Sequence, residues 1–340
     1  MNADVTEAAI DFAALRVDRH VVDRLSAHGV ISPAARDAAL ELIEPPRRWG
    51  VWTARLVTVV GAALVLAGIV YFFAFNWERI PPLTKLAAIA GLFAVAVGTV
   101  AAVGFGHLVS DVAASAAVLL VGVFLAVFGQ IYQTGADAWQ LFVGWAALTL
   151  PLALLAGSAA AWALWLTVAN IALLTWWDQA RPLVETRHIG LQLSIAVFDA
   201  AFLAAREVLA ARGVAWAAPR WTRFFVLVPM LTAATFAAVT VLDQPSLLSG
   251  VERLAAIALP LLFLGVWIVH RRLMPDVLAL AAAVMAGLVI ADFALFQLVT
   301  SGGRHTDLGI FFLMGIATIG LFAAATAWLR SVARAMEARS

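Results

Sequence analysis

Residues 112–129 read VAASAAVLLVGVFLAVFG, and this stretch, which holds no charged side chain, decides the fold. A helix needs about 20 mostly apolar residues to cross the hydrocarbon core of a bilayer. Backbone groups in lipid must find hydrogen-bond partners within the protein, so a long and uniform apolar run predicts a helix rather than an alternating barrel strand. The stretch therefore predicts a transmembrane helix.

Similar runs occupy most of the chain, and we count about ten of them. They cover residues 55–75, 84–105, 112–129, 139–156, 158–176, 188–205, 223–242, 253–270, 276–299 and 308–329. Charged or proline-containing segments separate most of them, whereas the break at Gly157-Ser158 is weak. There the two runs form a tight hairpin, or one of them is irregular. The sequence predicts an all-α fold, a polytopic transmembrane helical bundle with about ten helices.

Composition agrees with this fold class and excludes several functions. Hydrophobic residues make up 64% of the chain and charged residues 13%, whereas soluble domains are roughly 45–50% apolar. The excess apolar surface must face lipid. Cysteine is absent, which excludes disulfides and cysteine-based metal sites. A net charge of +1 argues against a nucleic-acid binder.

The domain boundaries follow from the same pattern. We expect a cytoplasmic N-terminal helix pair in residues 1–48, a transmembrane bundle in residues 49–330 and a cytoplasmic tail in residues 331–340. Within the bundle, residues 55–176 and 188–329 are expected to form two compact units. The N-terminal segment does not resemble a signal peptide, and its short soluble helix pair is typical of a small docking module for a protein partner or for the rest of the chain.

Arginine and lysine are more frequent near the predicted membrane ends on the side of the N-terminus. The positive-inside rule then places both termini in the cytoplasm, in agreement with an even number of spans. Glycines seven residues apart in the first three spans, such as Gly91 with Gly98 and Gly122 with Gly129, predict that these helices pack closely together.

The segment between the third and fourth runs is unusually polar. It reads GQIYQTGADAWQ from Gly129 to Gln140. One interpretation is a ligand or partner site at the outer membrane surface. The other is a structured turn in which Asp137 caps the next helix and Trp139 anchors it at the interface. The candidate residues are Gln130, Tyr132, Gln133, Asp137, Trp139 and Gln140.

Ionisable groups inside predicted spans are a second candidate, because such groups are costly in lipid and often functional. Gln192, Asp199 and Arg206 are seven residues apart and therefore share one helix face. Asp292 lies in another span. These groups could couple a proton or cation to transport, or they could be structural groups that pair with neighbouring helices. We expect Asp199 in the inner half of its span and Asp292 in the outer half.

Two further patterns are less informative. Asn76, Trp77 and Glu78 form a polar cluster at a predicted membrane interface, where charges are ordinary. The six histidines are scattered without metal-ligand spacing, and no P-loop, HExxH, GxSxG or dinucleotide-binding motif is present. The sequence therefore predicts no metal site, no cofactor and no enzymatic activity.

Three stretches resemble one known family. They are GQIYQTGADAWQLFVGW at 129–145, the stretch 61–82 that ends in FAFNWERIPP, and LSAHGVISPAARDAA at 25–39. They are similar to bacterial integral membrane proteins of the DUF2157 domain family, over about residues 15–175. The resemblance implies a location in the bacterial inner membrane and carries no activity over. It also implies, as an expectation, a membrane partner named for a GDYXXLXY motif, whose gene often lies beside that of the family member.

Two functions agree with these observations. The leading hypothesis is a non-enzymatic subunit or scaffold that acts with a membrane partner in the lipid bilayer. The alternative is a secondary transporter or permease for a small solute that uses intramembrane carboxylates. A transporter predicts a water-accessible cavity at mid-membrane lined by Asp199, Gln192 or the 129–140 loop, whereas a scaffold predicts a packed centre.

Overall fold

The computed structural model describes residues 19–43, scattered positions between 50 and 75, and residues 77–180, 187–244, 253–300 and 308–337. Every regular element within these ranges is helical. The chain divides into two compact units, Met1–Ile80 and Pro81–Ser340. The predicted first span, residues 55–75, lies largely outside the described residues.

The described residues of the first unit form two short helices, α1 (Arg19–Ala27) and α2 (Pro33–Ile43), and the single turn η2 (Trp77–Arg79). Gly29, with φ of +71°, follows the end of α1, and Ser32 Oγ accepts a hydrogen bond from the Ala35 backbone N–H at the start of α2. Arg36 donates to Asp23 Oδ1 at 2.9 Å and thereby joins the two helices.

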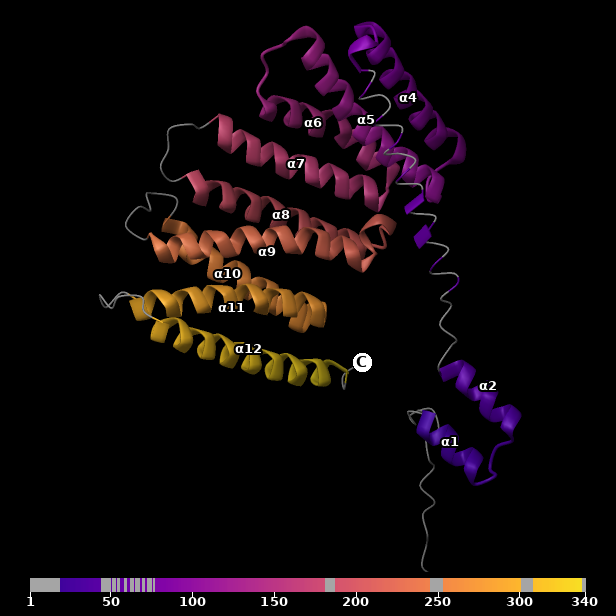
Figure 1. Ribbon diagram of the computed structural model, residues 1–340, viewed down its shortest axis with the longest axis vertical. Coiled ribbons are helices and arrows are strands. Elements are labelled where there is room, and N and C mark those ends of the chain that lie inside the picture. The colour runs from indigo at the N-terminus through magenta and orange to yellow at the C-terminus, as the bar shows by residue number, and fades with distance from the viewer. Residues whose placement is uncertain are drawn as a thin grey trace, which may run out of the picture. The chain divides into compact units, whose positions relative to one another are not determined.

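The second unit is a bundle of long helices (Figure 1). They are α4 (Pro82–Val103), α5 (Leu108–Tyr132), α6 (Ala138–Ala156), α7 (Ala159–Gln179), α8 (Arg187–Ala211), α9 (Arg220–Asp243), α10 (Ala255–Ile268) with the π-turn η6 (Val269–Leu273), α11 (Val277–Thr300) and α12 (Leu308–Glu337). The short turn η3 (Ala215–Ala217) precedes α9. Each long helix falls on one of the apolar runs found in the sequence.

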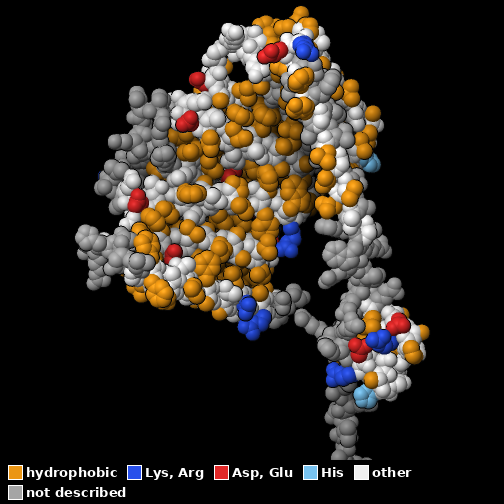
Figure 2. Space-filling view, in the orientation of Figure 1, with side chains coloured by type: hydrophobic (Ala, Val, Ile, Leu, Met, Phe, Trp, Pro, Cys, Tyr) orange, Lys and Arg blue, Asp and Glu red, His pale blue; other side chains and the backbone are white. Residues whose placement is uncertain are grey.

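Eight helices of the described residues are long and apolar enough to cross a membrane, namely the long helices of this unit except α8. Between 11% and 39% of each of these spans is buried inside the structure. The rest carries exposed apolar side chains such as Leu83, Leu92, Phe312 and Ile319. Figure 2 shows hydrophobic side chains across most of this face of the unit. Such a surface fits a lipid environment, as the composition predicted.

The weak break at Gly157-Ser158 is a tight hairpin between two regular helices. Gly157 ends α6 with φ of +57°, and Ser158 caps α7, its Oγ accepting from the Ala161 backbone N–H. α6 and α7 pack closely along their length. Of the two alternatives, the hairpin is therefore the one observed, even though α6 contains Pro151.

The core of the unit surrounds α9, which contacts α7, α8, α10 and α11. Leu227 and Met230 of α9 are fully buried, together with Leu166 of α7 and Leu280 of α11. α8 packs most extensively on α9 and also contacts α7. These contacts fix the positions of the polar side chains that α7 and α8 present to each other.

The prediction of close packing holds for α4 and α5, which contact each other extensively, but the glycines of α4 are not what brings them together. The Cβ of a residue placed at Gly122 would overlap the Trp145 ring of α6, whereas Gly91 and Gly98 of α4 meet nothing within 4 Å. The Trp145 indole donates to the Val118 backbone carbonyl at 2.7 Å. The glycine of α5 therefore makes room for a large ring on α6, and the α4–α5 contact does not use the glycines of α4.

Candidate functional site

The polar 129–140 segment forms the end of α5, a turn and the start of α6. Gln133 ends α5 in the left-handed conformation, with φ of +43°, and its N–H bonds to the Gly129 carbonyl. Gly135 adopts φ of +64°. Gln140 Oε1 then accepts from the Asp137 backbone N–H at 3.1 Å in a capping-box arrangement. These hydrogen bonds give the loop a defined shape.

The six predicted loop residues divide into two groups. Gln130, Asp137 and Gln140 line a groove of about 480 Å³ between the ends of α5 and α6. Tyr132, Gln133 and Trp139 are not among its lining residues. Tyr132 is 53% exposed and its ring packs 4.6 Å from the Phe128 ring, centroid to centroid.

Trp139 connects the loop to another helix. Its backbone N–H donates to Gln179 Oε1, at the end of α7, at 3.2 Å. The loop therefore lies at the same end of the unit as the α7 terminus. Apart from this link, the side chains between 132 and 138 are exposed, which leaves them accessible to a ligand or partner.

Asp199 lies in the middle of α8 and faces α7. It is 0% exposed, and Asn170 Nδ2 donates to its Oδ1 at 3.0 Å. Counted along Arg187–Ala211, Asp199 is at the centre of the helix, which extends beyond the predicted run. Asn170 was not among the predicted site residues, although it is an amide in the middle of a predicted span.

Gln192 and Asn170 line a larger groove of about 650 Å³ between α7, α8 and α9. Most other lining residues are apolar, among them Leu174, Phe225 and Phe236. Asp199 is not among the lining residues and lies behind Asn170. The groove thus brings a carboxamide from each of two helices to an otherwise apolar surface.

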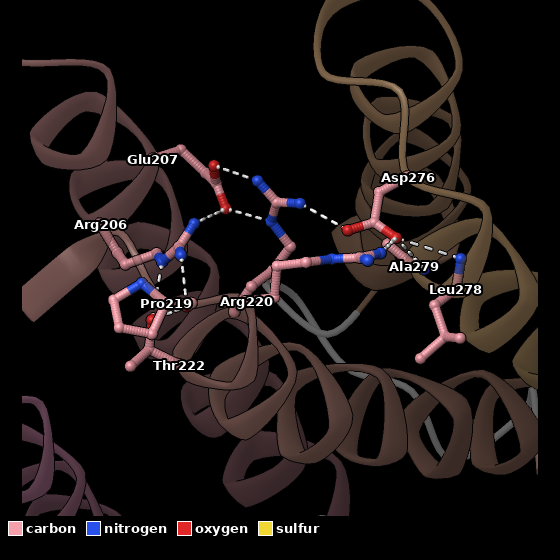
Figure 3. Close-up of polar contacts among 9 residues, drawn as sticks. Arg206, Glu207, Pro219, Arg220, Thr222, Asp276, Leu278 and Ala279 are labelled. Atoms are coloured by element: carbon pink, nitrogen blue, oxygen red, sulfur yellow. Dashed lines mark hydrogen bonds and ion pairs between the residues drawn. The ribbon is translucent and has the colours of Figure 1, made fainter. Parts of the chain in front are cut away.

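Arg206 belongs to an ion-paired cluster at the end of α8, drawn in Figure 3. Its guanidinium is 2% exposed and donates to Glu207 Oε1 at 2.6 Å. Arg223 of α9 reaches both oxygens of Glu207, at 2.7 and 2.8 Å, and Asp276 Oδ2 at 2.6 Å. Arg220 adds a contact to Asp276 Oδ1 at 3.0 Å. The cluster joins α8, α9 and the start of α11.

Backbone and hydroxyl groups complete the cluster. Arg206 also donates to Thr222 Oγ1 at 3.1 Å and to the Pro219 carbonyl at 2.9 Å. Asp276 Oδ1 accepts from the backbone N–H of Leu278 and caps α11. Burial alone would raise the pKa of Asp276, but the hydrogen bonds from Arg223 and Arg220 outweigh it and hold the pKa below its usual value.

The remaining predicted residues lie elsewhere. Asp292 of α11 accepts a hydrogen bond from Thr318 Oγ1 of α12 at 2.6 Å. Gln192, Asp199 and Arg206 share one helix face but contact different groups. Gln192 lines the groove beside α7, Asp199 accepts a hydrogen bond from Asn170, and Arg206 belongs to the ion-paired cluster. In the first unit, Trp77 and Glu78 form part of η2, whereas Asn76 lies outside the described residues.

Sequence reasoning did not single out Glu207, Arg223 or Asp276. Glu207 follows Arg206 directly, and Arg223 and Asp276 stand at the ends of predicted spans, where charges are expected. The only sequence feature that pointed to these three residues was the density of charged residues at one predicted membrane surface. Their convergence is a property of the tertiary fold.

Comparison with known proteins agrees with the motifs of the 129–145 and 25–39 stretches. Residues 23–162 match the model of a family described as predicted membrane protein (DUF2157). No curated protein and no solved structure matches the chain. The match confirms the resemblance found in the sequence, and it ends within α7, before the helix that carries Asp199. Over residues 23–162 the chain is therefore similar to the DUF2157 family of predicted membrane proteins.

Proposed function

We propose that the protein is a non-enzymatic, multi-pass subunit or scaffold of the bacterial inner membrane that holds a membrane partner. The observation that carries this proposal is that neither acid of the predicted spans lines the groove beside α7, although Gln192 does. Asp199 is 0% exposed, and Asp292 is engaged by Thr318 of the neighbouring helix. A coupling carboxylate in a transporter needs a path for water or solute, and neither carboxyl is reached by the groove beside α7.

The topology is part of the proposal. Ten spans result if residues 55–75 and α8 cross the membrane together with the eight long apolar helices. α8 has 25 residues, and a helix of that length covers about 37 Å, more than the roughly 30 Å hydrocarbon core. The arginine-rich ends of α8 and α9 then face the cytoplasm, as do both termini.

The 129–140 loop is the surface we assign to the partner. Its side chains are exposed, its backbone is fixed by capping hydrogen bonds, and its groove presents Gln130, Asp137 and Gln140. A preorganised loop loses little conformational entropy on binding. In the proposed topology this loop lies on the outer side, where a membrane partner of the GDYXXLXY type could reach it.

Affinity purification of the full-length chain from native membranes in mild detergent tests the proposal. We expect a membrane protein to co-purify with the wild type and its yield to fall at least tenfold, about 1.4 kcal/mol, in a Gln130→Ala, Tyr132→Ala, Asp137→Asn variant. A matched control, Phe312→Ala, alters an exposed apolar side chain on α12 and should retain the partner. Equal recovery with both variants would contradict the assignment to the loop, and recovery of the chain alone would contradict the subunit role.

A further inference from the structure

The Asn170–Asp199 pair contains two buried atoms without a partner. Within the described residues, Asn170 Oδ1 and Asp199 Oδ2 are both buried and form no hydrogen bond. Unsatisfied buried polar atoms are rare in folded proteins and each calls for an explanation. Here two such atoms belong to side chains that are already hydrogen-bonded to each other.

The existing hydrogen bonds use every donor of the pair. Asn170 Nδ2 carries two protons, and it donates to Asp199 Oδ1 at 3.0 Å and to the Leu166 carbonyl at 3.1 Å. The two remaining atoms are both acceptors, so the amide and an ionised carboxylate cannot satisfy each other further. One further donor between these two atoms would satisfy both of them.

A neighbouring cation does not supply the missing charge. No lysine, arginine or histidine among the described residues forms an ion pair with Asp199. Arg206, seven residues along α8, lies about 10 Å away and already donates to Glu207, Thr222 and Pro219. The other charged residues of the helices packed on α8 stand at helix ends, and they are Asp178 on α7 and Arg220, Arg223 and Asp243 on α9; η3 carries none.

A bound metal ion or solute fits the site poorly. Asp199 is 0% exposed and the two unpartnered oxygens are inaccessible to water. Hard cations require about six oxygen ligands, whereas this site offers two free ones. An unpaired carboxylate in such surroundings is strongly unfavourable. A single proton is the smallest group that removes the charge and satisfies both oxygens.

We propose that Asp199 is a proton-binding site in the centre of the bundle, with the proton on Oδ2 donated to Asn170 Oδ1. The acid and the amide then form a reciprocal pair of hydrogen bonds, and α7 and α8 are joined by a neutral link. Asn170 also lines the 650 Å³ groove, so the proton lies one side chain away from that surface. The site is independent of the partner-binding role proposed for the 129–140 loop.

Infrared spectroscopy of the purified full-length chain tests this site, because a protonated carboxyl absorbs apart from carboxylates. We expect a protonated-acid band in the wild type at mildly alkaline pH that is lost in Asp199→Asn and retained in Asp292→Asn. Asn170→Leu, which removes the acceptor, should keep the band and shift it towards a free acid. A wild-type spectrum whose protonated-acid region does not change in Asp199→Asn would overturn the proposal.

Thermal unfolding gives a second readout. Asp199→Asn replaces the O–H donor by an N–H donor and keeps both hydrogen bonds, so we expect a midpoint within about 3 °C of the wild type. We also expect the wild-type midpoint to be the same in sodium and potassium salts. A sodium-specific rise that Asp199→Asn abolishes would show a cation site and refute the proton.

Discussion

Helix α8 buries two acidic side chains, Glu207 near its end and Asp199 at its centre, and their surroundings differ completely. Glu207 receives hydrogen bonds from two arginines, Arg206 and Arg223. Asp199 receives one, from the amide of Asn170. Near the end of the helix, arginines from neighbouring helix ends can converge on a carboxylate. At the centre, the neighbouring helices offer apolar side chains and one amide, so the charge has to be removed instead of paired.

The comparison predicts that the two acids respond differently to the same isosteric change. Glu207→Gln leaves the buried Arg206 facing a neutral amide and also weakens the link to Arg223. Removing one member of a buried ion pair typically costs about 3–5 kcal/mol, so we expect a large loss of stability, measured as a lower midpoint of thermal unfolding in detergent. Asp199→Asn should change this unfolding midpoint little.

Arg220, the exposed member of the same cluster, provides the control for Glu207. The Arg220 side chain is 72% exposed although it contacts Asp276. Exposed ion pairs contribute about 0–1 kcal/mol, so Arg220→Ala should change the midpoint only slightly. If Arg220→Ala were as harmful as Glu207→Gln, burial would not be what distinguishes the members of the cluster.

A substitution at Gly190 tests packing separately from hydrogen bonding at the α7–α8 interface. The Cβ of Gly190→Ala would overlap the Trp177 ring, whose indole donates to Ser194 Oγ at 3.1 Å. Overpacking of this kind typically costs about 1–3 kcal/mol. We expect a lower unfolding midpoint, with no change in the infrared band assigned to Asp199.

Gly287→Ala on α11 is the matched substitution, because a Cβ at Gly287 meets nothing within 4 Å. Replacing an unconstrained helical glycine by alanine is neutral or favourable by up to about 1 kcal/mol. Equal destabilisation by both variants would mean that the Trp177 contact does not determine the effect.

The smallest expected effect concerns acid pH. The lowered pKa of Asp276 in the folded protein means that its ion pairs stabilise the fold above the ordinary aspartate range. This contribution is lost as pH falls through the lowered pKa. Unfolding midpoints measured across acid pH should therefore decline less steeply in Asp276→Asn than in the wild type. Parallel declines would show that Asp276 does not contribute to the acid sensitivity.

The positions of the spans could be predicted from the sequence because lipid imposes a simple rule on length and apolarity. Predicted runs such as 84–105 and 223–242 fall on α4 and α9, with ends that differ by a few residues. The hydrogen bonds of the 129–140 turn were also accessible, since Asp137 stands just before an apolar run and Gln140 three residues later.

The partners of the buried charges could not be predicted in this way. Arg206 and Asp199 were recognised as one polar face, but that pattern does not tell which neighbouring helix lies opposite each residue. Asn170 carries no charge and does not stand out in the sequence, although a neutral amide also needs hydrogen-bond partners in lipid. Glycine spacing was misleading for Gly122 because the same small residue can admit another helix or a single large ring.

The two-residue connection between α6 and α7 has a consequence for how the chain is built into the membrane. Gly157 and Ser158 turn the chain directly from one helix into the next. Such a short connection keeps the two facing helix ends close together while the chain enters the bilayer. We therefore expect α6 and α7 to enter the bilayer together, as a helical hairpin. An epitope inserted at this corner would lengthen the turn and uncouple their entry.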